Sequence, residues 1–381
     1  MKIVGILCEY NPLHLGHARQ ISKIREQSGQ DTAVVCLMSG NFVQRGHPAI
    51  FDKMLRARAA LQSGADLVLE LPVQYCLSSA EGFAAGAVSI LGTFCHEMSF
   101  GAEHPDRESL MDAARALLSP VFPEHLRQHL DAGLSFPAAR ARALADMGAD
   151  AQLVSCPNDI LAVEYCKAIL SQGCAMAPAP IPRPGSYHDA EADPENPSAT
   201  ALRALIENGK DFQPYVPTEL FRDAPVHTLR HGERAMLARL RTMTDGEFEA
   251  LPYGSEGLWR KLMYECRQRN TLEDILTAVK SKRYTRTRLD RMVMCAFLGL
   301  TAEDLASPVP YARILGFTKR GQTVLHTAKQ HTPLWNAGQR FDSPQWALEQ
   351  RCADLYGLFA EHTEPAGLEP KRRVIVFQQK I

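Results

Sequence analysis

The first 27 residues change abruptly from an apolar run to a helical pattern, and this change constrains the fold more than any other feature. The apolar run begins at Ile3 and breaks at Asn11-Pro12. Because Pro12 cannot donate to a strand ladder and the residue before a proline disfavours helical backbone angles, the run is predicted to be a buried strand that ends in a tight turn. From Leu13 to Gln27 apolar residues recur about one turn apart, which predicts a helix.

Two histidines stand at the start of this predicted helix. His14 and His17 are separated by three positions, so they share one helix face. The free N–H groups of a helix start favour phosphate, and two imidazoles there can donate to a phosphoryl group while charge builds on it. Gly16 removes a side chain between them, which would let a flat base approach the backbone. The alternative is a pair of surface histidines without a ligand.

Composition sets the broad class of the protein. The chain has 381 residues, enough for two domains or three, and 45% of them are hydrophobic, enough for sizeable cores. No apolar run is long enough to span a membrane and no secretory signal is evident, so we expect a cytoplasmic protein. Ten cysteines are scattered without zinc-type spacing, which predicts buried, reduced thiols and no metal ligands. With a net charge of −1, contact with nucleic acid would need a local basic patch.

Strand and helix patterns alternate through the first half of the chain. The strands predicted after the first one lie at residues 32–38, 66–71, 98–101 and 174–181. The predicted helices lie at residues 52–62, at 80–91 and over a long region that ends near residue 170. This alternation predicts an α/β fold with a parallel sheet covered on both faces. Since ligands of such sheets bind beyond the carboxyl ends of the strands, the informative residues should follow the strands.

Polar residues do follow the predicted strands. The loop at 38–46, with its glycines, amides and arginine, could serve a ligand or be an ordinary surface loop. Gly101 would let a nucleotide lie close to the backbone. Asn158 could cap a helix, or it could read a ribose or base. Arg183 could clamp phosphate oxygens, and it is followed by Tyr187-His188-Asp189.

A second phosphate-binding arrangement is predicted at the next helix start. Ser198 and Thr200 supply hydroxyl groups there, and Arg203 lies about one turn later. A capping Ser198 with a solvated arginine is the alternative.

The second half of the chain is predicted to be mainly helical and contains a basic segment. Helices are predicted at 232–251, 257–269 and 271–280, and residues 310–317 are interpreted as a turn and short helix. Basic residues interleaved with Tyr284 suit RNA, through phosphate contacts and base stacking. A solvated helix face is the alternative. The predicted RNA contacts are Lys280, Lys282, Arg283, Arg286 and Arg288.

These motifs, in this order, resemble those of a known family. The sequence His14-Leu15-Gly16-His17 is similar to the HIGH signature of nucleotidyltransferases and class I aminoacyl-tRNA synthetases, although the K-M-S-K-S loop of the synthetases is absent. The whole set resembles the bacterial tRNA(Met) cytidine acetate ligase family over positions 3 to about 317. The matching motifs are E-Y-N-P-L-H-L-G-H, M-S-G-N-F-V-Q-R-G, G-A-D-L-V-L-E-L-P, S-F-G-A-E, P-N-D-I-L-A-V-E-Y, Y-H-D, S-A-T-A-L-R and Y-A-R-I-L-G-F.

The resemblance implies two domains with different functions. Residues 1–208 would form a Rossmann-like nucleotidyltransferase domain with a parallel sheet, and residues 209–381 a mainly helical, tRNA-binding domain. Acetate would attack the α-phosphate of ATP, giving acetyl-adenylate and pyrophosphate, and the wobble cytidine of elongator tRNA(Met) would take the acetyl group. Mg²⁺ is expected on the phosphates. Elongator tRNA(Met) and acetate are the expected partners, without a membrane or a dedicated protein partner.

The resemblance also assigns roles to residues. His14 and His17 would be catalytic, and Arg183 and Arg203 would offset charge on the phosphates. The implied ATP-binding residues are Leu7, Cys8, Glu9, Tyr10, Asn11, Pro12, Leu13, His14, Leu15, Gly16, His17, Ala18, Arg19, Gln20, Gly101, Asn158 and Arg183. Two other functions stay open: an adenylyltransferase that acts on a small phosphorylated metabolite, and a non-catalytic RNA-binding protein.

Overall fold

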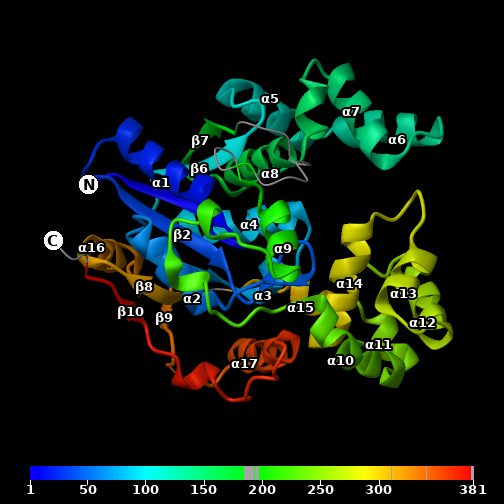
Figure 1. The fold of residues 1–381 in the computed structure, drawn as a ribbon. Helices are drawn as coiled ribbons and strands as arrows, with labels where there is room; N and C mark the ends of the chain where they lie inside the picture. Colours follow the sequence, from blue (N-terminus) through cyan, green and yellow to red (C-terminus); the bar gives the residue numbers. More distant parts are fainter. Residues whose placement is uncertain (184–192, 194–196, 310, 340, 379–381) are drawn as a thin grey trace.

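A mixed, mostly parallel sheet forms the centre of the protein (Figure 1). The computed structural model describes residues 1–183, 193, 197–309, 311–339 and 341–378. The strands of the sheet are β1 (Ile3–Cys8), β2 (Ala33–Ser39), β5 (Leu67–Leu71), β6 (Glu97–Ala102), β7 (Ala177–Pro182), β8 (Ala312–Phe317), β9 (Leu334–Asn336) and β10 (Ile375–Val376). Their order is β10-β8-β5-β2-β1-β6-β7, and β9 pairs with β8.

The five strands predicted in the first half of the chain are all present and pair in parallel. β1 lies between β2 and β6, while β5 pairs with β2 and β7 pairs with β6. The chain therefore builds outward from β1 in one direction and later in the other, which creates a switch point between β1 and β6 at the carboxyl ends of the strands. The predicted α/β fold with a parallel sheet is confirmed.

Helices cover both faces of this sheet, so its strands are buried on both sides. Val35 of β2 belongs to a core shared with α4, α5, α8 and α16, while the adjacent Val34 belongs to a core shared with α1, α2 and α9. These helices and their neighbours are α1 (Leu15–Ser28), α2 (Lys53–Gln62), α3 (Val73–Cys76), α4 (Ala80–Leu91), α5 (Arg107–Leu118), α6 (Phe122–Asp131), α7 (Phe136–Asp146), α8 (Pro157–Gln172), α9 (Ala199–Glu207) and α16 (Lys319–Ala328). Within the described residues, no helix combines the length and the apolar character that a membrane crossing needs.

A third core holds most helices of the second half together, and its residues 229–298 are green to yellow in Figure 1. These are α10 (Leu229–Thr242), α11 (Asp245–Glu249), α12 (Leu258–Gln268), α13 (Leu272–Val279), α14 (Arg286–Leu298) and α15 (Ala302–Ala306), with α17 (Pro344–Tyr356). The helices predicted at 257–269 and 271–280 are confirmed. The one predicted at 232–251 is divided into α10 and α11, because Thr244 and Glu247 form a capping box that starts a new helix.

The interpretation of residues 310–317 as a turn and short helix is wrong. Residue 310 lies outside the described part, and residues 312–317 form β8, antiparallel to β5. Ile314 packs into one core and Leu315 into the opposite one. So short an apolar run carries no local signal that separates strand from helix, and the free edge of β5 supplies the pairing. The sheet thus takes strands from both sides of residue 208, and a division of the chain there stays a prediction.

Four charged side chains are buried together where α2, β5 and β8 meet the C-terminal segment. The Nζ of Lys53 lies 2.6 Å from Glu70 Oε1 and 2.7 Å from Glu369 Oε1. Arg313 also pairs with Glu369, and each of the four is at most 2% exposed. Burial opposes the charge of Glu369, yet Lys53 and Arg313 lower its pKa to about 2. This cluster ties the C-terminal segment to the sheet.

The mutation Lys53→Met should therefore remove one of the two buried cations, Lys53 and Arg313, that Glu70 and Glu369 share. We expect the free energy of unfolding to fall by about 3–5 kcal/mol, the range for breaking a buried ion pair. Urea denaturation at pH 7 would measure it. Arg115→Ala removes an exposed pair with Asp112 and should cost less than about 1 kcal/mol. Equal losses in the two variants would contradict a structural role for the buried cluster.

Candidate active site

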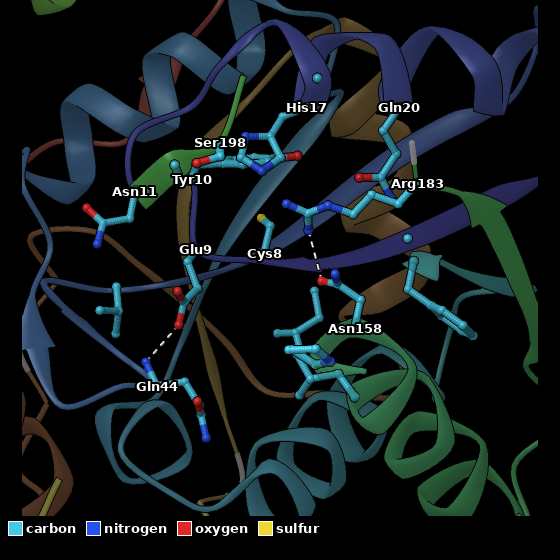
Figure 2. A pocket seen from close by; sticks show the side chains of 18 of the residues that line it. Cys8, Glu9, Tyr10, Asn11, His17, Gln20, Gln44, Asn158, Arg183 and Ser198 are labelled. Carbon is cyan, nitrogen blue, oxygen red and sulfur yellow. Dashed lines mark hydrogen bonds between the residues drawn. The ribbon is translucent and has the colours of Figure 1, made fainter. Parts of the chain in front are cut away.

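A cavity of about 560 Å³ opens at the carboxyl ends of β1, β6 and β7 (Figure 2). It lies at the switch point of the sheet, where the alternation of strands and helices predicts a ligand site. The sequence-predicted residues that line it are Leu7, Cys8, Glu9, Tyr10, Asn11, His14, Gly16, His17, Arg19, Gln20, Gly101, Asn158, Arg183, Ser198, Thr200 and Arg203. Pro12, Leu13, Leu15 and Ala18, also predicted as ATP-binding, are not part of the lining.

The turn after β1 is held by its own polar groups. Tyr10 has a left-handed backbone with φ of +47°, and the Asn11–Pro12 peptide bond is cis. The Oδ1 of Asn11 accepts from the backbone N–H of Ile50 at 2.7 Å, and Arg203 donates to the Asn11 carbonyl oxygen at 2.8 Å. The side chain of Asn11 therefore fixes the turn that leads into α1.

The two histidines lie stacked at the start of α1. Their ring centroids are 3.7 Å apart, and the backbone N–H of His14 donates to Nδ1 of His17 at 3.3 Å. Since Nδ1 of His17 accepts, its neutral ring carries the proton on Nε2. Both ring nitrogens of His14, a residue 3% exposed, have no hydrogen-bond partner within the described residues. The pair therefore offers hydrogen-bonding groups that a phosphate oxygen could use.

Gly16 lines the cavity, and its missing side chain also affects the neighbouring histidine. A Cβ added there would lie 3.0 Å from Cε1 of His14, so the missing side chain makes room for the His14 ring. Both imidazoles are also kept neutral. Burial and then the charge of Arg183 lower the pKa of His17 to about 3, and burial followed by His17 lowers the pKa of His14 well below its ordinary value.

A chain of hydrogen bonds positions Arg183 at the cavity, as Figure 2 shows in part. Arg183 donates to Asn158 Oδ1 at 2.9 Å, and the Nδ2 of Asn158 donates to Glu103 Oε1 at 2.6 Å. The other oxygen of Glu103 accepts from the backbone N–H of Asp159 at 2.9 Å. Glu103 thus fixes the orientation of the Asn158 side-chain amide, with Oδ1 toward Arg183. Asn158 is not the cap of α8, because Cys156 occupies the N-cap position.

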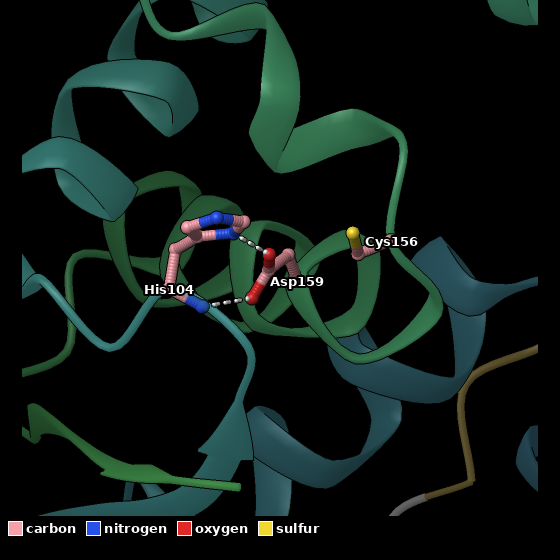
Figure 3. A group of neighbouring side chains, drawn as sticks. All are labelled: His104, Cys156 and Asp159. Carbon is pink, nitrogen blue, oxygen red and sulfur yellow. Dashed lines mark hydrogen bonds and ion pairs between the residues drawn. The ribbon is translucent and has the colours of Figure 1, made fainter. Parts of the chain in front are cut away.

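Behind Asn158, His104, Cys156 and Asp159 lie side by side (Figure 3). The buried Asp159 accepts from the backbone N–H of His104 at 3.0 Å and pairs with its Nδ1 at 2.6 Å. Ligand atoms of the three residues lie within 4.8 Å of one another, which is close enough for a shared ion. Sequence spacing predicts no such group, because His104 is remote from the other two. The His104–Asp159 pair anchors the start of α8.

Residues 198–203, predicted to bind phosphate, form the start of α9, and Ser198 is its N-cap. The Oγ of Ser198 accepts from the backbone N–H of Ala201 at 3.1 Å, which is the capping alternative. Arg203 reaches back to the Asn11 carbonyl oxygen and to Thr200 Oγ1. All three predicted residues still line the cavity. Tyr187-His188-Asp189 lies outside the described residues.

The loop predicted at 38–46 starts with the end of β2 and continues into a hairpin of β3 (Phe42–Val43) and β4 (His47–Pro48) beside the cavity. The backbone N–H of Gln44 donates to Glu9 Oε1 at 2.7 Å, as Figure 2 shows. Gln44, Arg45 and His47 line the cavity together with Thr287 and Arg291 of α14. The two α14 residues were missed by sequence reasoning, because only folding brings that helix to the N-terminal motif.

The arginines of the basic segment are engaged in the fold. Arg286 bonds the Glu273 carboxylate through Nη1 and Nη2 and Asp290 through Nε, and Arg283 pairs with Glu256. Arg288 donates to the carbonyl oxygen of Tyr253. Lys280 and Lys282 are exposed. The predicted RNA-binding set therefore contains residues that hold α14 in place as well as exposed cations.

Known proteins resemble this chain over nearly its whole length. A family model described as HIGH Nucleotidyl Transferase matches residues 1–369. The tRNA(Met) cytidine acetate ligase of Clostridium novyi is 36% identical, over 88% of this chain and 89% of that protein. That of Clostridium acetobutylicum is 33% identical, over 99% of this chain and 100% of that protein. Thermotoga maritima TmcAL bound with α-thio ATP superposes with a TM-score of 0.87 at 30% identity over 99% of both chains.

The chain belongs to the HIGH nucleotidyltransferase family. The resemblance to its tRNA(Met) cytidine acetate ligase branch, predicted from the motifs, is confirmed. The apo form of Thermotoga maritima TmcAL superposes with a TM-score of 0.90 at 29% identity, covering 99% of this chain and 100% of that one. In this member of the family, the two histidines of the HIGH signature, His14 and His17, stack on each other.

The neutral state of this signature can be tested by NMR. In the unfolded chain both histidines take up a proton below about pH 6.5. In the folded chain their pKa values are lower, so both rings stay neutral at that pH. The fold therefore loses stability as the pH falls through about 6.5. We expect the ¹⁵N imidazole signals of His17 to stay those of a neutral ring with Nε2 protonated down to pH 5. His104 should behave oppositely, because its hydrogen bond to Asp159 raises its pKa. A His17 titration centred near pH 6 would contradict this lowering of its pKa.

Proposed function

We propose that this chain is an ATP-dependent ligase that activates acetate as acetyl-adenylate and acetylates the wobble cytidine of elongator tRNA(Met). The observation that carries the proposal is the match, over almost all of the chain, to relatives named tRNA(Met) cytidine acetate ligase. The cavity supports it, because a HIGH signature and arginines meet there at the carboxyl ends of parallel strands.

The first step is attack of the acetate oxygen on the α-phosphorus of ATP. The new P–O bond forms as the bond to the bridging oxygen breaks, and pyrophosphate leaves. Nε2–H of His17 and the ring of His14 donate to oxygens whose negative charge grows in the transition state. Arg183, held by Asn158, and Arg203 offset the repulsion between the acetate and phosphate anions. No strong base is required, since acetate is an anion near neutral pH.

Mg²⁺ belongs to the proposal as an ion carried by the phosphates. Among the described lining residues, Glu9 alone has a carboxylate, and one of its oxygens already accepts from Gln44. The cavity thus suits an ion that is bound mainly by phosphate oxygens and water rather than by a protein cage.

The proposal also covers the binding of tRNA and the location of the protein in the cell. The helical part after residue 208 would bind tRNA, with Lys280 and Lys282 on phosphates and Arg283, Arg286 and Arg288 beside them. A cytoplasmic location agrees with ten free cysteines, none of them in a disulfide.

The mutation His17→Ala tests the activation step. Loss of one oriented donor should lower acetate-dependent ATP–pyrophosphate exchange about a hundredfold, with a thermal midpoint close to that of the wild type. His362→Ala, which changes an exposed histidine outside the cavity, serves as the matched control. Exchange at the wild-type rate would mean that the signature is structural.

The deciding experiment supplies only labelled acetate, ATP, Mg²⁺ and tRNA(Met). We expect label in the tRNA, N4-acetylcytidine at the wobble position by nucleoside mass spectrometry, and one AMP for each acetyl group. ADP in place of AMP, or a requirement for acetyl-coenzyme A, would refute the adenylate route. AMP transfer to a phosphorylated metabolite would favour an adenylyltransferase, and RNA binding without ATP turnover would favour a non-catalytic protein.

A further inference from the structure

The cavity has a second wall that activation of acetate does not use. It consists of Gln44, Arg45 and His47 from the β3–β4 hairpin and Thr287 and Arg291 from α14, and we call it the hairpin wall. We propose that the hairpin wall binds the cytosine that accepts the acetyl group, and that His47 takes up the proton released by its amine. This inference rests on the proposed function and adds the residues of the second half-reaction.

The hairpin wall is built rigidly. Gly46 has a φ of +80°, and a Cβ added to it would lie 2.5 Å from the backbone nitrogen of Arg291 and from the carbonyl carbon of Asp290. The turn of the hairpin therefore lies directly on the backbone of α14, where only glycine fits. Arg291 also donates to the carbonyl oxygen of Gln44 at 3.4 Å. The same residue, Gln44, is bonded to Glu9 of the N-terminal motif, so the wall has a fixed place relative to the nucleotide side.

Arg291 provides a preorganised cationic donor in this wall. It is 9% exposed, and its guanidinium lies 5.0 Å from the centre of the Tyr253 ring. Its Nε is buried and has no hydrogen-bond partner within the described residues. Arg291 lines the cavity, and a buried donor without a partner is costly unless a ligand completes it. Besides its amine, the pairing edge of cytosine presents two acceptors, N3 and O2, which suit such a donor.

His47 stands where the cavity opens to solvent. Its Nε2 lies 3.8 Å from Oδ2 of the buried Asp290, and its side chain is 39% exposed. Asp290 is itself held by Arg286, whose Nε donates to it at 2.8 Å. An imidazole placed beside a fixed carboxylate is suited to accept a proton and to stabilise the resulting charge.

The path of the RNA agrees with this position. α14 begins within the basic segment, at Arg286, and Thr287 and Arg291 are one helical turn apart on the face that lines the cavity. An RNA strand with phosphates at Lys280 and Lys282 could follow α14 toward the hairpin wall. Single-stranded loops are the RNA elements that can splay a base into a pocket in this way.

The chemistry of the step balances. The N4 amine forms a bond to the carbonyl carbon of acetyl-adenylate, and the bond between that carbon and the phosphate oxygen breaks, so that AMP leaves. The nitrogen loses one proton, which goes to His47. No oxidant, reductant or further reactant is required.

The test separates the two half-reactions. For each variant we compare the rate of acetyl transfer from enzyme-bound acetyl-adenylate to tRNA(Met) with the rate of acetate-dependent ATP–pyrophosphate exchange. His47→Ala should lower the ratio of transfer to exchange about a hundredfold, the usual effect of losing a general base. Added imidazole should restore part of the transfer rate. His331→Ala, an exposed histidine outside the cavity, should leave the ratio unchanged.

A second variant tests the binding role without touching the proton acceptor. Thr287→Phe should fill the space for the base and lower the same ratio at least tenfold. Wild-type ratios in both His47→Ala and Thr287→Phe would overturn the inference, and a loss in His47→Ala that imidazole does not restore would overturn the proton-acceptor role. Failure of the wild-type enzyme to exchange with acetate would instead remove the proposed function, and this inference with it.

Discussion

The geometry of the site depends on one fully buried arginine. Arg56 of α2 donates to the carbonyl oxygens of Phe51 at 2.8 Å, Glu9 at 2.6 Å and Ser39 at 3.1 Å, and also to that of Gly40. Glu9 directly follows β1, Ser39 and Gly40 lie at the end of β2, and Phe51 lies between β4 and α2. Near the ends of strands, buried carbonyls would otherwise lack donors. A planar guanidinium with five donors can satisfy several of them at once. The side chain of Arg56 therefore joins the two loops that carry the N-terminal motif and the hairpin, in addition to the bonds from Gln44 to Glu9 and from Ile50 to Asn11.

Polar contacts connect the loops held by Arg56 to the helical part of the protein. Glu9 receives the backbone N–H of Gln44, and Gly46 of the same hairpin lies on the α14 backbone. On the other side of the cavity, Glu103 holds Asn158, which holds Arg183. Each contact joins segments far apart in the sequence. A ligand that moved Glu9 would thus act on the hairpin directly, through the bond from Gln44 to Glu9.

This arrangement explains which features could be predicted from the sequence. β1 and α4 were predicted because their apolar periodicity is local, and His14 and His17 because a strand, a turn and a helix start follow one another. Strand β8 was not, since its partner is the edge of a remote strand. Glu103 and Arg291 were missed as site residues for the same reason: their significance comes from partners brought near by folding.

Neutral histidines beside charged arginines would stabilise the transition state of the proposed reaction more than its ground state. A cation binds ATP strongly in the ground state as well as in the transition state, and uniform binding does not raise the rate of the chemical step. A neutral N–H donor interacts weakly with the ground-state phosphate and more strongly as negative charge builds on its oxygens. Burial and Arg183 hold the pKa of His17 at about 3, so this donor does not become a cation near neutral pH. In the proposed mechanism, Arg183 would supply the constant attraction that brings two anions together, and the histidines would supply the stabilisation that grows with the reaction.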